Sequence, residues 1–177
     1  MIDWKDVHGC ENTFEFYDML VQILPSKSRV LEMGVFYGKG LVYLAQNSDF
    51  QIYGVDQFKV EDMPYQKDDI KTDTDFYEAC LKNVIGYVLE SRIALIPMNS
   101  ERASRMFPDH FFDCVFIDGK HDYESAKNDI SMWRDKVKPE GFLSGDDYVT
   151  PWGGVIQAVD EVFPTRSLMG QTWYIQV

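Results

Sequence analysis

The chain has 177 residues, of which 45% are apolar and 15% aromatic, so it can form one globular domain with a sizeable core. Its net charge of −12 argues against nucleic acid or an anionic membrane as the main partner. No apolar run is long enough to span a membrane, and residues 1–10 lack an apolar signal core. With three cysteines that share no metal-ligand spacing, these features predict a cytoplasmic protein.

Helical and strand patterns alternate along the chain. Helices are predicted at residues 11–24, 39–47, 75–88, 101–107, 122–137 and 155–163, and strands at 29–35, 51–56, 92–97, 112–118 and 142–147. The last two runs, 166–170 and 172–177, have no helix between them and predict an antiparallel hairpin. We therefore predict a single α/β domain over 1–177, with a Rossmann-like, doubly wound, seven-stranded sheet that is mostly parallel.

The first strand runs into a glycine-rich turn, in the segment SRVLEMGVFYGKG at residues 28–40. Glycine lets the backbone approach a ligand closely, and the helix that follows offers free N–H groups at its start. The second strand ends at Asp56, about 20 residues further on, where an acid can accept hydrogen bonds from a ribose diol. Together they predict a nucleoside site, although glycines that only shape a turn are the alternative.

The spacing of these glycines bears on the kind of nucleoside. Gly34, Gly38 and Gly40 do not fit the dinucleotide pattern G-x-G-x-x-G, which counts against a nucleotide-linked oxidoreductase. The order Glu32-x-Gly34-x-x-x-Gly38 instead resembles motif I of the class I S-adenosylmethionine-dependent methyltransferases. The resemblance implies S-adenosylmethionine as cofactor.

Residues 59–75, which follow the second strand, are charged and lack clean periodicity. A polar insertion directly after a ligand-binding strand is often a lid or substrate loop. A mobile surface loop without contact to substrate is the equal alternative.

Three predicted strands end in carboxylates, at Asp56, at Asp118 and at the pair Asp146–Asp147. The carboxyl ends of parallel strands share one edge, so Asp118 and the pair should converge. Converging carboxylates repel unless a cation or a proton relieves them, and Mg²⁺ accepts a few carboxylates plus water and substrate oxygens. The sequence thus predicts a divalent-metal site. The alternative is that one acid points away, most simply Asp147, because adjacent strand residues face opposite ways.

The sequence around these acids resembles that of the cation-dependent O-methyltransferases, in the segments FIDGKHDYE at 116–124 and LSGDDY at 143–148. The nearest branch includes TylF-like macrocin O-methyltransferases, cephalosporin hydroxylase-like proteins and Methyltransf_24-like domains. In that branch an acid after strand four and an acidic pair after strand five hold the metal. The resemblance runs from about Arg29 to Phe163 and implies metal ligation by Asp118, Asp146 and Asp147.

The resemblance also implies cofactor contacts near the first two strands. Glu32 and Gly34 would line the methionine and ribose part of the cofactor, and Gly38 would allow its close approach. Asp56 would bind the ribose hydroxyls. Gly40 departs from the family, which commonly has Ser or Thr at this helix start, so one hydroxyl contact is missing.

Further contacts follow strands three and four. Asn99 and Ser100 occupy the place where the family contacts adenine, and Asp118 would also lie near the methionine moiety. His121 stands where catechol-type relatives have a basic Lys, which predicts a general base, with a structural tether or a place around the metal as alternatives. Little chain precedes the first strand, so a partner subunit of a homo-oligomer could cover the substrate.

The expected function is divalent-metal-assisted O-methylation of a small-molecule hydroxyl, such as a catechol or a sugar diol. A metal-independent N- or O-methyltransferase keeps the cofactor and drops the metal. A non-catalytic methyltransferase-fold binding module is the third alternative. Specificity in this architecture lies in loops, so the acceptor is not fixed by the sequence.

Overall fold

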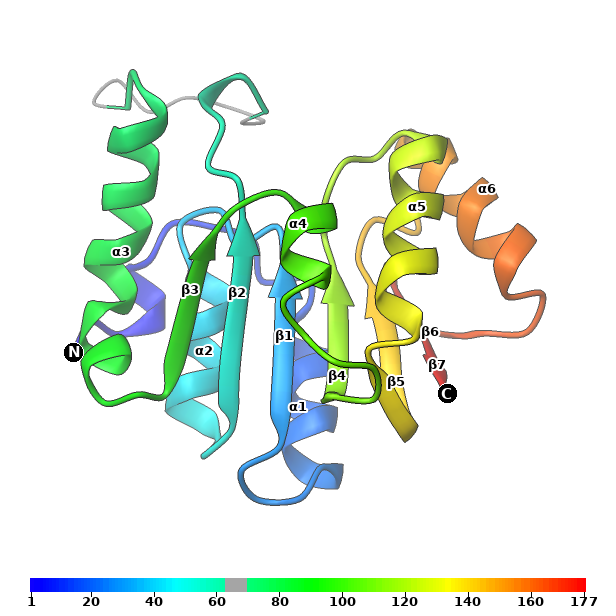
Figure 1. Ribbon diagram of the computed structural model, residues 1–177, viewed down its shortest axis with the longest axis horizontal. Helices are drawn as coiled ribbons and strands as arrows, with labels where there is room; N and C mark the ends of the chain where they lie inside the picture. Colours follow the sequence, from blue (N-terminus) through cyan, green and yellow to red (C-terminus); the bar gives the residue numbers. More distant parts are fainter. Residues whose placement is uncertain (63–69) are drawn as a thin grey trace.

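The computed structural model describes residues 1–62 and 70–177 and forms one sheet with the order β3-β2-β1-β4-β5-β7-β6 (Figure 1). The strands are β1 (Arg29–Met33), β2 (Gln51–Asp56), β3 (Ile93–Pro97), β4 (Phe112–Ile117), β5 (Val137–Gly145), β6 (Ser167–Met169) and β7 (Thr172–Gln176). The first five are parallel, and β7 pairs antiparallel with both β5 and β6. This confirms the predicted seven-stranded, Rossmann-like sheet with its antiparallel hairpin.

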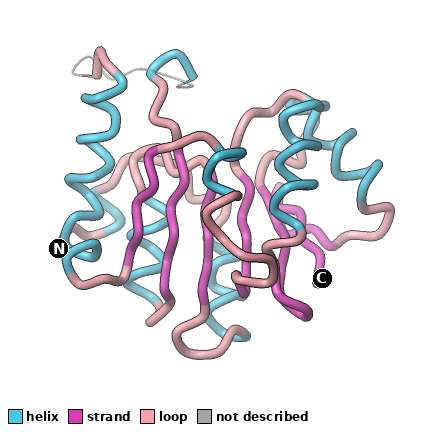
Figure 2. The backbone as a smooth tube through the Cα atoms, viewed as in Figure 1, coloured by secondary structure: helices cyan, strands magenta, loops and turns pink. Residues whose placement is uncertain are grey.

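Six helices of the described chain cover the two faces of the sheet, which forms the middle layer (Figure 2). They are α1 (Phe14–Ile23), α2 (Lys39–Asn47), α3 (Asp73–Leu89), α4 (Ser100–Ser104), α5 (Tyr123–Arg134) and α6 (Gly153–Val162). Buried residues of α1, α2 and α3 share one apolar cluster, and those of α4, α5 and α6 share the other. The central strands β1 and β4 are buried on both faces, as parallel strands under two helical layers must be.

The strand order reverses beside β1. The chain adds β2 and β3 on one side of β1 and then crosses to β4 on the other. Ligands bind in the crevice above the carboxyl ends of strands at such a reversal. Figure 1 shows these ends along the upper edge of the sheet.

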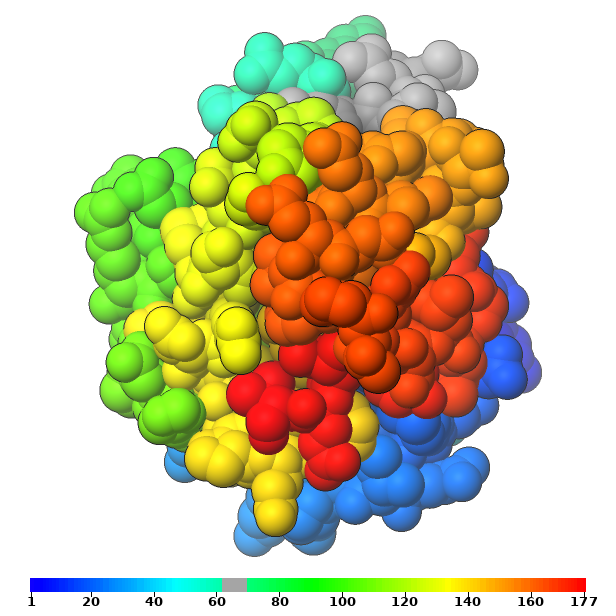
Figure 3. Space-filling view, turned by 90° about the vertical axis from the view of Figure 1, so that its right-hand side faces the viewer, coloured from blue at the N-terminus to red at the C-terminus, as the bar shows by residue number. Residues whose placement is uncertain are grey.

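At the side of the sheet beyond β5, α6 and the C-terminal hairpin form the surface of the molecule (Figure 3). Val155, Ala158 and Val159 of α6 are buried, and Trp173 of β7 is 1% exposed in the same apolar cluster. The hairpin therefore closes the sheet beyond β5, and α6 packs beside α5 over it.

Some predicted boundaries were wrong. The helix predicted to reach residue 137 ends at Arg134, and Val137 already pairs with Phe112 of β4. Residues 139–141, a Pro-Glu-Gly turn signal before the strand predicted at 142–147, lie within β5, where a register shift lets Glu140 take a positive φ of 66°. Pairing with β4 thus overrides the local turn signal. Among the described residues, no helix is long and apolar enough to cross a membrane.

Candidate active site

A cavity of about 1120 Å³ opens above the carboxyl ends of the central strands. Its lining comes from the N-terminal segment, the β1–α2 turn and the ends of β2, β3, β4 and β5. Among the residues singled out from the sequence, the cavity is lined by Glu32, Gly34, Asp56, Asn99, Ser100, Asp118, His121, Asp146 and Asp147. The fold therefore brings all but one of the predicted site residues to one place, and the exception is Gly38.

Gly34 and Gly38 both have left-handed backbones, with φ of 87° and 83°, but for different reasons. A Cβ on Gly34 would lie 1.6 Å from the carbonyl oxygen of Asp118, so this glycine lets the ends of β1 and β4 touch. A Cβ on Gly38 would lie 2.9 Å from Val84 of α3. Gly38 is thus needed for packing against α3, and its predicted role of admitting the cofactor stays a prediction.

Glu32 is a buried acid at the end of β1, and it is 6% exposed. Its Oε2 atom has no hydrogen-bond partner among the described residues. Burial raises the pKa of Glu32 to about 8, and the charge of Asp56 adds to the effect. A Cβ on Gly40 would lie 2.6 Å from both Glu32 carboxylate oxygens. The Ser or Thr expected at this helix start therefore has no room, which explains the glycine.

Asp56 is held rigidly by the backbone on both sides. The amide of Phe36 donates to its Oδ2 at 3.0 Å, and that of Phe58 donates to its Oδ1 at 2.7 Å. The carboxylate thus links the β1–α2 turn to the segment after β2. A carboxylate oxygen can accept more than one hydrogen bond, so a diol in the cavity can bind to the same group.

Asn99 and Ser100 lie at the start of α4, and their side chains already have partners. The Asn99 side chain caps the helix by accepting from the amide of Arg102 at 2.9 Å. The Ser100 hydroxyl donates to Asp129 at 2.6 Å and accepts from the Trp133 indole at 2.7 Å. Ser100 has therefore used its single donor on the protein.

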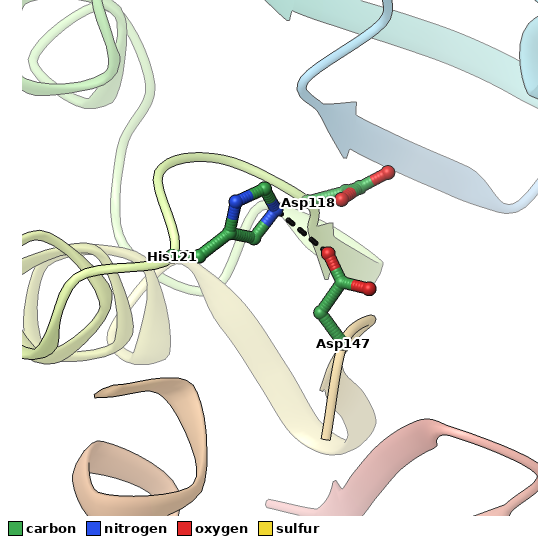
Figure 4. Close-up of side chains that lie close together, drawn as sticks. All are labelled: Asp118, His121 and Asp147. Atoms are coloured by element: carbon green, nitrogen blue, oxygen red, sulfur yellow. Dashed lines mark ion pairs between the residues drawn. The ribbon is translucent and has the colours of Figure 1, made fainter. Parts of the chain in front are cut away.

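Asp118, His121 and Asp147 come together at the ends of β4 and β5 (Figure 4). One ligand atom from each lies within 4.8 Å of the others, and His121 Nε2 is 2.7 Å from Asp147 Oδ2. Asp147 has a left-handed φ of 60°, which Asp tolerates better than most residues. That backbone turns its carboxylate toward His121, so the alternative in which Asp147 points away does not hold.

Asp146 does not belong to this group and is 7% exposed. Its Oδ2 accepts from Asn12 Nδ2 at 2.5 Å and from Gln171 Nε2 at 3.4 Å. The Thr172 hydroxyl lies 3.5 Å from the other oxygen. The described donor atoms within reach of one another are those of Asp118, His121 and Asp147, and metal ligation by Asp146 stays a prediction.

Several acids crowd the cavity, and each disfavours ionisation of the others. The pKa of Asp118 is raised well above its ordinary value by burial and by the charges of Asp146 and Asp147, with Glu32 and Asp56 adding to it. Such a group gains from any positive charge placed beside it. Two carboxylates and an imidazole within reach of one another are suitable donors for a divalent cation.

His121 is fixed from several sides. The Trp152 ring stacks on it, with ring centroids 4.1 Å apart and an interplanar angle of 25°. A Cβ on Gly154 would lie 2.5 Å from the His121 carbonyl oxygen, so the start of α6 packs tightly on the loop. Asp122 caps α5 directly after it, accepting from the amide of Ser125 at 3.0 Å. No local pattern predicts this role for Trp152, because it lies 31 residues from His121 along the chain.

The N-terminal segment also lines the cavity, a role that sequence reasoning missed. Lys39, the first residue of α2, is 8% exposed and its ammonium is 2.6 Å from Glu11 Oε1. The same ammonium lies 3.4 Å from the Gly9 carbonyl oxygen. These contacts hold residues 8–13 against the cavity, while cover by a partner subunit stays a prediction.

The insertion at 59–75 is described only at its two ends. Lys59 lines the cavity and its ammonium pairs with Asp73 at the start of α3. The amide of Val60 donates to the same carboxylate at 3.0 Å. Residues 63–69 lie outside the described part of the chain. The choice between a lid and a surface loop falls on these residues and stays a prediction.

Comparison with solved structures gives the same fold. A proposed O-methyltransferase from Klebsiella pneumoniae aligns with a TM-score of 0.68 and 17% identity, over 96% of this chain and 81% of that one. A proposed caffeoyl-CoA O-methyltransferase from Staphylococcus aureus gives 0.69 and 14%, over 98% and 87%. The O-methyltransferase NovP gives 0.70 and 17%, over 93% and 79%. A comparison with curated protein sequences found no significant match.

The sheet, its order reversal and the cavity lined by Asp56 define the class I S-adenosylmethionine-dependent methyltransferase fold. A family model described as "Methyltransferase domain" matches residues 31–148. The chain therefore belongs to this methyltransferase family and is an S-adenosylmethionine-dependent methyltransferase. The resemblance drawn from motif I and from the acids after β4 and β5 is confirmed at this level.

Proposed function

We propose that the protein transfers a methyl group from S-adenosylmethionine to an oxygen of a small-molecule acceptor. The observation that carries the proposal is the meeting of Asp56 and the Asp118–His121–Asp147 group in one cavity. A nucleoside binder and an acid–base group in a shared space can hold a methyl donor beside an acceptor. The names of three structural neighbours, which refer to O-methyl transfer, support the choice of oxygen.

The cofactor fits the residues present. Asp56 is oriented by two backbone amides, Gly34 exposes backbone at the β1 end, and Glu32 has an oxygen without a partner among the described residues. We assign ribose binding to Asp56, and the methionine side of the cavity to Glu32, Gly34 and Asp118. The bound cofactor supplies an electrophilic methyl group. The chain's task is to place an acceptor oxygen in line with it.

We further propose that Asp118 and Asp147 hold a divalent cation, with His121 beside them. A bound divalent cation lowers the pKa of a hydroxyl near it and fixes its orientation, which suits acceptors with two neighbouring oxygens. The crowding of negative charge on Asp118 favours such an ion. MycE, a structural neighbour at a TM-score of 0.58 and 18% identity, is described in complex with Mg and SAH.

His121 can act as a base or as a cation ligand, but one nitrogen cannot serve both tasks. In the observed geometry Nε2 faces Asp147 Oδ2 at 2.7 Å, so a neutral ring donates from Nε2 and keeps its lone pair on Nδ1. Ligation through Nε2 would move the proton to Nδ1 and remove that lone pair. We assign the base role to His121, oriented by Asp147.

A metal-free N- or O-methyltransferase is the second candidate, because His121 and Asp147 already satisfy each other as a closed pair. The test combines labelled S-adenosylmethionine with catechols, vicinal diols and amines, with EDTA and then with excess Mg²⁺. Transfer to a diol that EDTA abolishes and Mg²⁺ restores is the expected result. Full transfer in EDTA would reject the cation and leave the metal-free enzyme.

A second measurement does not depend on activity. Mn²⁺ binding, followed by electron paramagnetic resonance, should weaken by at least about tenfold in Asp147→Asn. Asp113→Asn is the control, because Asp113 pairs with Lys138 near the amino end of β4. Cofactor binding without transfer to any acceptor in the panel would favour the non-catalytic binding module.

A further inference from the structure

A buried acid in the middle of α5 lines the cavity. Asp129 is 9% exposed and belongs to the cavity wall that Asn99, Ser100 and Met132 also line. A buried carboxyl without a full set of partners is costly, so such groups are usually paired. Because Asp129 lines the cavity, its carboxyl can take a further partner from there.

The two oxygens of Asp129 differ in their surroundings. Oδ1 accepts from the Ser100 hydroxyl at 2.6 Å, and Ser100 in turn accepts from the Trp133 indole at 2.7 Å. These two bonds fix the carboxyl between α4 and α5. Oδ2 makes no hydrogen bond to the described residues, and it lies 3.2 Å from where a Cβ on Gly119 would be. The missing side chain of Gly119 leaves space beside that oxygen.

The wall around Asp129 has the character of a base-binding pocket. Met98 and Met132 line the same cavity, and thioethers pack well against aromatic rings. A flat, apolar ring with one amino group on its edge complements such a wall with one buried acceptor. Burial raises the pKa of Asp129 to about 6, so a donor in front of it would also favour the ionised form.

We propose that Oδ2 of Asp129 accepts a hydrogen bond from the exocyclic amine of the cofactor's adenine. This inference rests on the proposed cofactor site and adds to it the residue that reads the base. S-Adenosylmethionine has two amino groups, and the charged one belongs to its methionine end. That end must reach the Asp118–His121–Asp147 group with the methyl group, which leaves the adenine amine for the thioether-lined wall.

The test compares two ligands that differ at one position of the base. S-Adenosylhomocysteine has the 6-amino group, and S-inosylhomocysteine has a 6-oxo group that cannot donate. Wild-type protein should bind the adenosyl ligand about 10–100-fold more tightly, measured by titration calorimetry. Asp129→Asn keeps an acceptor for Ser100 and places an amide donor at the other position. Its preference should fall at least about tenfold, or reverse toward the oxo ligand.

Ser100→Ala is the matched control, since it removes the bond that holds Asp129 and leaves the carboxyl in place. Weaker binding of both ligands, with the preference kept, is expected for that variant. If Asp129→Asn loses equal affinity for both ligands, Asp129 only ties α4 to α5 and the inference is overturned. Equal binding of both ligands by wild-type protein would overturn this inference but leave the proposed function standing. Failure of folded wild-type protein to bind either ligand would overturn the proposed function as well.

Discussion

At the scale of single residues, the acids of the cavity differ in what already holds them. Asp56 is bound by two backbone amides and Asp146 by side-chain amides, so both are oriented before any ligand arrives. Asp147, by contrast, is oriented by one contact, in which its Oδ2 lies 2.7 Å from His121 Nε2. Preorganised acceptors bind a ligand without the entropy loss of being ordered first, and Asp147 has this advantage only through its contact with His121.

Asp56→Ala should weaken binding of S-adenosylmethionine roughly 10–100-fold, because each charged acceptor bond contributes about 1.5–3 kcal/mol. Titration calorimetry measures the change, and a melting curve checks that the loop tied by Phe36 and Phe58 is still folded. Asp49→Ala is the control, since Asp49 accepts from Lys27 at the amino end of the sheet. Unchanged affinity in folded Asp56→Ala protein would remove this acid from the site.

His121→Gln should lower turnover by about 10²–10⁴ if proton removal limits the rate, with cofactor affinity kept. His110→Gln is the control, because His110 contacts the Val137 carbonyl at the far end of β4. Initial rates from about pH 6 to pH 9 provide the measurement. A His121 variant that keeps full activity over this range would show that the imidazole is not the base.

At the scale of elements, the site depends on close backbone contacts between neighbours. The β1 end touches the β4 end through Gly34, and the start of α6 touches the loop that carries His121 through Gly154. Because packed interiors adjust poorly to extra volume, small changes at these contacts should move the site as a unit. The two adjacent glycines at the start of α6 allow a direct comparison.

Gly154→Ala should destabilise the protein by about 1–3 kcal/mol, since the new Cβ would lie 2.5 Å from one backbone atom of the His121 loop and 2.6 Å from another. Gly153→Ala meets no described atom within 4 Å and should be neutral or stabilise by up to about 1 kcal/mol. Urea unfolding measures both, and activity should fall in Gly154→Ala alone. Equal stability of the two variants would contradict this packing.

At the scale of the whole molecule, buried acidity links stability to pH. The pKa of Glu32 rises from an ordinary 4.5 to about 8 because of burial and the Asp56 charge. The folded protein thus keeps a proton that the unfolded chain loses above 4.5. The contribution is complete below that pH and is lost as the pH rises toward about 8, beyond which it is constant.

Glu32→Gln should therefore flatten the fall in unfolding free energy between about pH 5 and pH 8, by up to about 1.4 kcal/mol per pH unit. Chemical denaturation of the cofactor-free protein at several pH values gives the two slopes. Glu15→Gln, on the exposed side of α1, should keep the wild-type slope. Identical slopes for Glu32→Gln and wild-type protein would show that Glu32 does not hold its proton in the folded state.

Local patterns in the sequence determined the order and type of nearly every element. The hydrophobic periodicity of a segment shows which of its sides is buried, and turn residues mark where it ends. Both signals depend only on residues that are neighbours along the chain. The same logic placed Asp56 and Asp118 at strand ends, because parallel strands share a carboxyl edge. The helix end near residue 137 was missed, since strand pairing with Phe112 decided it.

Only the tertiary structure decided which side chains face one another. Asp146 and Asp147 are adjacent, yet one meets Asn12, 134 residues away, and the other meets His121. The left-handed backbone at Asp147 separates them, and no periodicity encodes that angle. Gly38 packs closely against Val84 of α3, and Asp129 lines the cavity from the middle of α5. Such partners depend on distances across the fold, so they follow from packing and not from spacing along the chain.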